Sequence, residues 1–183
     1  MTDAARRERF KVLLTEEAYT VAWRYSQRLC LQAGGGRADA EDLLQEALTR
    51  AFLGLHTLRD ESRFPGWLLA ILRRQHLSRL KARRGDPLLV GDPSADSGFA
   101  AAYEPQNAEA QLALEALARL PDGPRELLAL TCLDGLSPNE AAAVLGIAPR
   151  AVRMRLTRAR KLLRAEYGRT DIPIAEHCSG RTT

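Results

Sequence analysis

Apolar residues recur every three or four positions through most of the chain, and strand-type alternation never lasts beyond a few residues. This spacing predicts amphipathic helices and an all-α fold. In the N-terminal part it predicts a helix over 15–32, with Thr15 as a candidate N-cap and the glycines 34–36 as the stop, and a shorter helical segment before it. A second helix is predicted to begin at Asp39 as N-cap. Its buried face would contain Leu43, Leu44, Ala47, Leu48, Ala51, Phe52 and Leu55.

A third helix is predicted from near Pro65, which suits a first turn, to the breaker at 85–87. Its inner face would contain Leu68, Ile71, Leu72 and Gln75. In the C-terminal part the pattern predicts helices over 106–120, 125–133, 137–145 and 149–167. The segment 121–124 reads as a turn between the first two, because it holds two prolines and a glycine.

The helices predicted over 137–145 and 149–167 form a pair with clear punctuation. Ser137 and Glu140 have the spacing of a capping box, in which each satisfies a backbone N–H of the other. Gly146 permits the left-handed backbone of a sharp turn, and Pro149 starts the next helix. Val152 opens the inward face of that helix, and Leu156, Ala159 and Leu163 continue it. The pair is a helix-turn-helix signature.

The second helix of this pair carries an unbalanced charge: its basic residues have no acidic residue among them between positions 150 and 164. A polyanion would relieve their mutual repulsion, which points to DNA. Arg153 and Arg158 suit bidentate contacts to guanine, and Met154 and Thr157 suit thymine methyls or sugars. The remaining outward cations would grip phosphates: Arg150, Arg155, Arg160 and Lys161.

The third predicted helix carries another basic surface that includes Arg79 and Arg83 and stands beside Phe64. Basic residues beside aromatics suit melted nucleic acid, whose unpaired bases can stack. The alternative for Trp67 is a plain core residue, since large aromatics are usually buried. The surface expected to face melted DNA consists of Arg63, Trp67, Arg73, Arg74, Lys81 and Arg84.

Composition divides the chain in two. Glycine and proline cluster over 85–105, where four acidic residues and no basic one occur, so this stretch reads as a flexible acidic linker. We therefore expect two small helical domains, 1–84 and 106–167, and a tail over 168–183. The net charge of +4 favours a polyanionic partner without proving one.

Several classes of protein are disfavoured. The three cysteines lie far apart and form no C-x-x-C pair, which argues against a disulfide framework or a zinc site and favours reduced thiols in the cytoplasm. Two neighbouring donors in the tail, His177 and Cys178, do not make a metal site. No metal, no cofactor and no catalysis are expected, because the three histidines have no nucleophile or carboxylate at a useful spacing. No apolar run approaches the roughly 18 residues that span a membrane.

Three segments, in this order, resemble extracytoplasmic-function sigma factors of the sigma-70 family. Residues 39–46 (DAEDLLQE) are similar to the family's helix for the clamp coiled coil of the largest polymerase subunit. Residues 64–71 (FPGWLLAI) look like the start of its promoter-melting, minus-ten helix (region 2). Residues 120–146 with 152–160 (VRMRLTRAR) resemble its minus-thirty-five domain (region 4). The likeness covers about residues 10–167.

The resemblance implies a function. An acidic and amide face would meet core RNA polymerase through Asp39, Glu41, Asp42, Gln45 and Glu46. The loop 56–63 would capture a flipped minus-ten base, the polymerase flap would be a second contact, and an anti-sigma factor would hold the protein inactive. The family usually has Asn at Arg74, often Asp at Ser78, and often Gly-Thr at Arg150-Ala151; these departures bear on the promoter sequence. The alternative is a helix-turn-helix regulator that acts without being a polymerase subunit.

Overall fold

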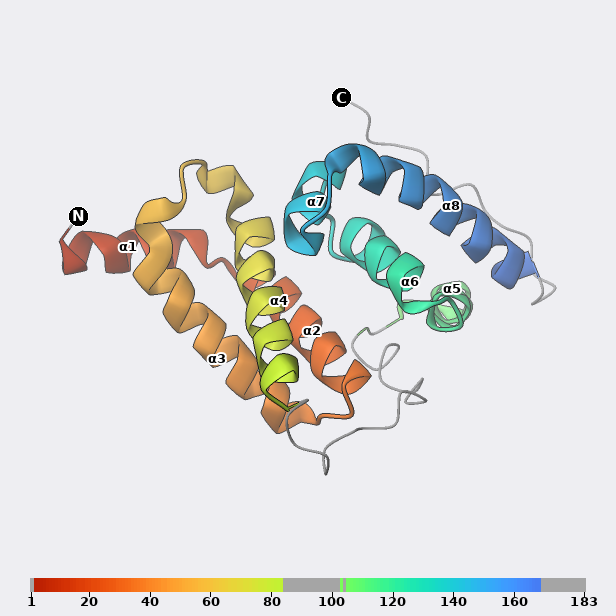
Figure 1. Cartoon of the computed structure of the whole chain (residues 1–183), viewed down its shortest axis with the longest axis horizontal. Coiled ribbons are helices and arrows are strands. Elements are labelled where there is room, and N and C mark those ends of the chain that lie inside the picture. The colour runs from red at the N-terminus through yellow and green to blue at the C-terminus, as the bar shows by residue number, and fades with distance from the viewer. Residues whose placement is uncertain (1, 84–102, 104, 169–183) are drawn as a thin grey trace. The chain divides into compact units, whose positions relative to one another are not determined.

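The computed structural model describes residues 2–83, 103 and 105–168, and these are helical with no strand (Figure 1). This confirms the all-α prediction. The backbone divides into two compact units, 1–103 with 143–146, and 104–142 with 147–183. The acidic residues of the linker, Arg84 and the pair His177 and Cys178 lie outside the described residues. No helix in the described part is long and apolar enough to cross a membrane.

The first unit is built on a three-helix bundle of α2 (Glu16–Gln32), α3 (Arg37–Gly54) and α4 (Phe64–Arg83). A short helix α1 (Asp3–Leu13) precedes them and contacts α3. The 3-10 turns η1 (Leu55–Thr57) and η2 (Glu61–Arg63) connect α3 to α4 (Figure 1). The apolar positions predicted for the second and third helices are largely buried, among them Leu43, Leu44, Ala47, Ala51, Leu55, Leu68 and Leu72.

The start of α2 is as predicted, and the start of α3 is not. The Thr15 side chain caps α2 by accepting from the Ala18 N–H at 3.1 Å. Helix α3 begins two residues earlier than expected, with Gly36 as N-cap. Asp39 lies inside the first turn, where its Oδ2 accepts from the Gly36 N–H at 2.8 Å. The prediction of Asp39 as N-cap was therefore wrong: an acidic residue stabilises the start of a helix equally well by reaching back from the third position.

The second unit contains α5 (Ala108–Ala118), α6 (Asp122–Leu128), a π-helical turn η4 (Ala129–Leu133), α7 (Pro138–Leu145) and α8 (Pro149–Gly168). Helix α8 packs against α5 and α6. Their apolar sides supply the buried residues Leu114, Leu117, Leu127, Leu128, Val152 and Leu156. Helices α5, α6 and α8 therefore form the core of the second unit.

The segment predicted as a turn at 121–124 is the first turn of α6. Pro121 is the N-cap, with φ −55° and ψ 150°, and its carbonyl accepts from the Arg125 N–H at 3.0 Å. The prediction failed because the first N–H groups of a helix have no intrahelical partner, so Pro124 costs nothing there. At its other end α6 continues into the π turn, where the Asp134 N–H donates to the Ala129 carbonyl at 2.9 Å.

Candidate nucleic-acid interface

The turn between α7 and α8 has the predicted geometry. The Ser137 N–H donates to Glu140 Oε2 at 2.9 Å, and the Glu140 N–H donates to Ser137 Oγ at 3.3 Å. Gly146 adopts φ +67°, and the Ile147 N–H closes the end of α7 on the Ala142 carbonyl at 3.1 Å. A residue with a Cβ would be strained at that φ. Local sequence signals thus fix where α7 stops and α8 starts.

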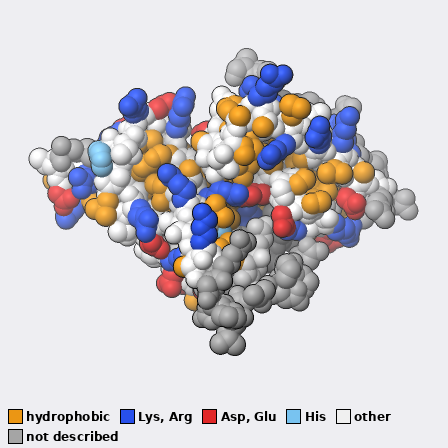
Figure 2. Space-filling model, in the orientation of Figure 1, with side chains coloured by type: hydrophobic (Ala, Val, Ile, Leu, Met, Phe, Trp, Pro, Cys, Tyr) orange, Lys and Arg blue, Asp and Glu red, His pale blue; other side chains and the backbone are white. Residues whose placement is uncertain are grey.

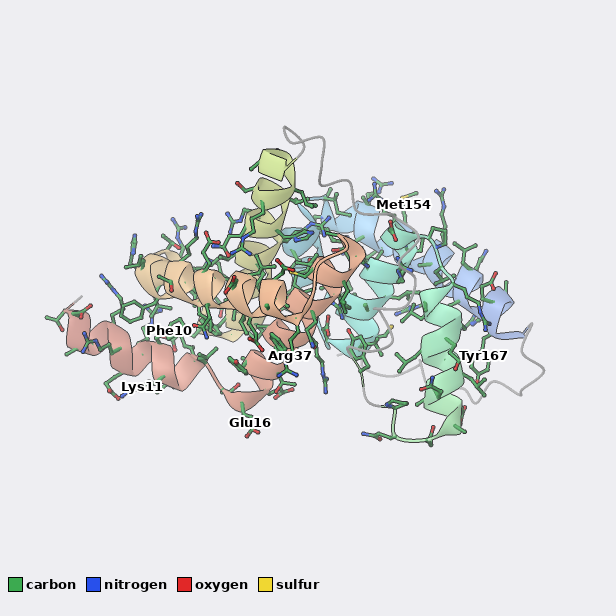
Figure 3. The ribbon with its side chains drawn as sticks, turned by 90° about the horizontal axis from the view of Figure 1, so that it is seen from below. Phe10, Lys11, Glu16, Arg37, Met154 and Tyr167 are labelled. Carbon is green, nitrogen blue, oxygen red and sulfur yellow. The ribbon has the colours of Figure 1, made fainter. Side chains whose placement is uncertain are left out.

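Helix α8 separates apolar and basic residues cleanly. Val152, Leu156 and Ala159 are buried. Met154, labelled in Figure 3, is 55 % exposed; Thr157 is exposed too, and its hydroxyl donates to the Arg153 carbonyl at 3.2 Å. The basic side chains predicted to contact DNA are all exposed, namely Arg150, Arg153, Arg155, Arg158, Arg160 and Lys161. The exposure predicted for the outward face is therefore confirmed, as is the burial of the first three residues of the inward face; the fourth, Leu163, is only partly buried.

The charge on α8 is not compensated within the described part of the chain. None of the ion pairs there involves a basic residue between Arg150 and Arg164. Figure 2 shows Lys and Arg side chains along the outer side of this helix. A row of unpaired cations on a rigid helix attracts a polyanion and releases its counterions on binding.

The basic residues of α4 are placed differently. Arg79 Nη2 lies 2.8 Å from Glu46 Oε2 of α3, and Arg73 Nη1 lies 3.4 Å from the Tyr25 hydroxyl of α2. Arg74 is exposed and bends back to the Ala70 carbonyl at 3.0 Å, while Lys81 is exposed. The predicted basic surface of α4 is therefore only partly open to a ligand.

Trp67 is half-buried near the start of α4, with its ring centroid 6.0 Å from that of Phe64. Phe64 itself is fully buried. The Trp67 side chain thus fits both alternatives, a core residue and a stacking surface for bases, since one part packs on Phe64 and the rest remains accessible. Arg63, directly before α4, is exposed, and its Nε lies 3.0 Å from Asp60 Oδ2.

Asp60 organises the segment between the two 3-10 turns. Its carboxylate accepts from the Ser62 hydroxyl at 2.6 Å and from the Ser62 N–H at 3.1 Å. The hydrogen bond from the Ser62 hydroxyl is the main reason that the pKa of Asp60 lies below its usual value, with the Arg63 charge adding to it. At neutral pH this carboxylate is charged and partly neutralises Arg63.

The acidic face of α3 is exposed at Glu41, Asp42 and Gln45. Glu41 pairs with Arg37 at 3.0 Å on the same helix. Glu46 is more engaged, because Arg79 and Arg50 both reach its carboxylate, at 2.8 Å and 2.9 Å. The Arg79 hydrogen bond, followed by the charges of Arg79 and Arg50, holds the pKa of Glu46 below its usual value.

Sequence reasoning missed the part played by α1. Arg9 of this helix contacts the segment between α3 and α4, and Phe10 contacts Phe52 of α3 and Phe64 of α4. Their partners lie about fifty residues away in sequence, so no local spacing signals the contact. Phe10 is the one aromatic residue of α1, and only that character could have singled it out.

Comparisons with known proteins match both units. The family model for sigma-70 region 2 matches residues 15–85, and that for sigma-70, region 4 matches residues 110–163. The ECF RNA polymerase sigma factor EcfG of Rhodopseudomonas palustris is 38 % identical over 136 residues, which cover 71 % of this chain and 72 % of EcfG. The protein named Probable RNA polymerase sigma factor RfaY, of Xanthomonas campestris pv. campestris, is 36 % identical over 138 residues, which cover 70 % of this chain; the chain spans about a third (34 %) of RfaY.

Two solved structures are also similar. CnrH in complex with the cytosolic domain of CnrY aligns with a TM-score of 0.52 at 25 % identity, over 89 % of each chain. The sigma factor RpoE in complex with the anti-sigma factor NepR, from Bartonella quintana, aligns with a TM-score of 0.54 at 24 % identity, over 82 % of this chain and 94 % of RpoE; this likeness is one of fold. The helical units, the two matched regions and the relative that aligns over most of its length agree, and the chain belongs to the extracytoplasmic-function sigma factors of the sigma-70 family, which direct core RNA polymerase to promoters.

Proposed function

We propose that this sigma factor reads the minus-ten element with region 2 (1–84) and the minus-thirty-five element with region 4 (106–167). The linker 85–105 would connect the two, and 168–183 would be a tail. The protein would act in the cytoplasm as a non-catalytic subunit of the polymerase. The observation that carries the proposal is a contrast between two faces: the basic face of α8 pairs with no acid among the residues that the structure describes, whereas α3 presents an exposed acidic face.

Helix α8 is the element proposed to enter the major groove of the minus-thirty-five element. Its N-terminal half presents Arg153, Met154 and Thr157 outward, and residues at this end of a recognition helix reach base edges. Arg158, which directly follows Thr157 and is exposed, suits a second guanine. The remaining exposed cations would fix the helix on the phosphates: Arg150, Arg155, Arg160 and Lys161.

The α3 face is proposed to bind the clamp coiled coil of the largest polymerase subunit. Its sign is wrong for DNA and right for a basic protein surface. Glu41, Asp42 and Gln45 are exposed and make at most an intrahelical pair, so they are free to exchange partners. Glu46 and Asp39 would contribute less, because both carboxylates are already engaged within the fold.

Melted minus-ten DNA would lie across the start of α4. The exposed side of Trp67 offers a stacking surface. Arg63 is an exposed cation directly before α4, and two more exposed cations follow along the helix, Arg74 in its middle and Lys81 near its end. Arg73, which touches the Tyr25 hydroxyl, would help by orientation more than by direct contact. Arg84 belongs to the proposed surface on sequence grounds.

A regulatory partner is also proposed. Both solved relatives are held in complexes, CnrH with the cytosolic domain of CnrY and RpoE with the anti-sigma factor NepR. We infer that an anti-sigma factor binds this chain as well, and that region 4 also contacts the polymerase flap.

Run-off transcription from the cognate promoter tests the proposal. Core polymerase with this protein as the only added factor should give promoter-specific transcripts. A helix-turn-helix regulator would give none without a second sigma factor, and that result would reject the proposal.

A charge reversal then locates the contact with core polymerase. Asp42→Lys should lower the affinity for core polymerase, because it opposes like charges across the interface. Glu17→Lys, an exposed acid on α2, is the matched control and should leave that affinity unchanged. Equal loss in both variants would remove the α3 face from the proposal.

A further inference from the structure

Arg9 of α1 makes two contacts with the segment between α3 and α4. Its Nε donates to Glu61 Oε1 at 2.7 Å, and its Nη2 donates to the Leu58 carbonyl at 3.2 Å. One guanidinium therefore joins a backbone group between the two 3-10 turns to a side chain of the second turn. Both bonds are charge-assisted, and their fork fixes direction as well as distance.

Phe10, the next residue on α1, fixes the same region from inside. Its ring meets Phe52 of α3 edge-on, with centroids 5.6 Å apart, and meets Phe64 of α4 with centroids 5.9 Å apart. Figure 3 shows Phe10 on the side of α1 that faces α3. Such edge contacts favour one ring orientation over others. Phe10 thus holds α1 against both ends of the connecting segment.

Apart from the two Arg9 contacts, the hydrogen bonds and ion pair described for the side chains of this segment join residues no more than three positions apart. Leu55 and Leu58 are buried, whereas the other side chains from His56 to Arg63 are exposed. An exposed segment of this kind opens locally more easily than the helices beside it. Arg9 comes from another helix and binds the Leu58 carbonyl and the Glu61 carboxylate. These two bonds restrict the positions that the exposed side chains of the segment can adopt.

We propose that α1 is a brace for the base-capturing segment 56–63, and that Arg9 is a positioning residue for minus-ten selectivity. The inference rests on the proposed reading of the minus-ten element by region 2, and on the capture of a flipped base that the family resemblance implies for residues 56–63. Arg9 need not touch the DNA. It sets the position of the Leu58–Glu61 backbone, on which the pocket for a flipped base would depend, since an error of about 1 Å in positioning is costly for recognition.

The test uses the full chain assembled with core polymerase. Two promoters are compared that differ only at the captured minus-ten base. The fluorescence of 2-aminopurine placed beside that base reports open-complex formation, and the measured quantity is the ratio of open complex on the two promoters. Arg9→Ala should lower this ratio about fivefold, as expected for one exposed ion pair and one charge-assisted hydrogen bond. Discrimination at the minus-thirty-five element and affinity for core polymerase should not change.

Three variants make the result specific. Arg7→Ala, on the same helix with an exposed pair to Asp3 at 3.0 Å, should behave as wild type. Arg9→Lys should restore part of the ratio, since one of two contacts can re-form. Arg9→Glu combined with Glu61→Arg should restore more than either single change. Glu61→Gln, which leaves Arg9 in place, carries the test if Arg9→Ala unfolds.

Two outcomes would overturn the proposal. Unchanged base selectivity in Arg9→Ala, or in Glu61→Gln where Arg9→Ala does not fold, would show that the contact does not position the segment. Equal weakening on all promoters, with no rescue by Arg9→Lys or by the charge swap, would show a general structural role. Failure of the proposed function is distinct, because the wild-type protein itself would then give no promoter-specific opening.

Discussion

Two helices of similar basic composition differ in what surrounds their charges. On α4, Arg79 is paired with Glu46 and Arg73 reaches a tyrosine hydroxyl, so part of the positive charge is used to hold the bundle together. On α8, no carboxylate in the described part of the second unit pairs with the basic residues from Arg150 to Arg164. A count of basic residues does not distinguish the two helices. The partners of those residues distinguish them, because a cation that is not paired within the protein is fully available to DNA.

The difference also has a cost. Arg155, Arg158, Lys161 and Arg164 follow one another at intervals of three along α8, where like charges repel by about 0.2–0.5 kcal/mol per pair. Burial of Val152 and Leu156 offsets this repulsion. Acidic residues on α8 would relieve this repulsion, and the helix has none between Arg150 and Arg164. Binding to a polyanion would relieve it instead, so the stability that the free helix loses is recovered in the complex.

The largest test of the comparison removes three of the proposed phosphate contacts of α8. Arg155→Ala, Arg160→Ala and Lys161→Ala together should reduce the slope of log affinity against log salt by about 2.7, since each phosphate contributes about 0.9. Affinity for DNA should fall about a hundredfold on every sequence alike. Filter binding or anisotropy at several salt concentrations measures both. An unchanged salt slope would mean that these cations do not meet phosphates.

The next test separates base contacts from phosphate contacts on the same helix. Arg158→Ala should reduce discrimination at one minus-thirty-five base pair by about 1–3 kcal/mol, or roughly five- to 150-fold, because a bidentate guanine contact is lost. Binding to non-specific DNA should change little. Arg160→Ala is the matched control and should weaken both kinds of DNA equally. The same behaviour in Arg158→Ala would assign Arg158 to a phosphate.

The features that could be predicted from the sequence are local ones. The caps at Thr15 and Ser137 and the left-handed Gly146 depend on residues within a few positions, and all three are observed. The inward and outward faces of α8 follow from helical periodicity alone. The two errors, at Asp39 and at 121–124, are also local, and each arose because acidic residues and prolines suit both a cap and a first turn.

The features that could not be predicted join distant residues. Arg79 and Glu46 are 33 residues apart, and Arg9 and Glu61 are 52 apart. Nothing in the helical spacing shows which face of α4 meets α3, so the sequence places Glu46 with the exposed acids and Arg79 on the basic surface of the third predicted helix. The packing of the bundle decides which charges cancel.

The test with the smallest expected effect concerns the pairing of Glu46 with Arg79. Glu46→Gln should lower the stability of the first unit at pH 7 by at most about 1 kcal/mol, because the carboxylate is partly exposed and solvent screens its pairs. Since the pKa of Glu46 is lowered from the usual 4.5, its stabilisation is present above that value and is lost as the pH falls through the lowered pKa. The difference between wild type and Glu46→Gln should therefore vanish in acid.

Urea unfolding followed by tryptophan fluorescence measures this difference, because Trp23 and Trp67 both lie in the first unit. Glu41→Gln is the control, since Glu41 has a single exposed partner on its own helix. Its effect at pH 7 should be smaller, about 0.3–0.5 kcal/mol. If the two variants were equally destabilised, or if the Glu46→Gln difference persisted well below the usual carboxyl pKa, the charges of α3 and α4 would not be coupled. The ion pairs between α3 and α4 would then be a geometric feature that contributes nothing to stability, and they would not distinguish α4 from α8 energetically.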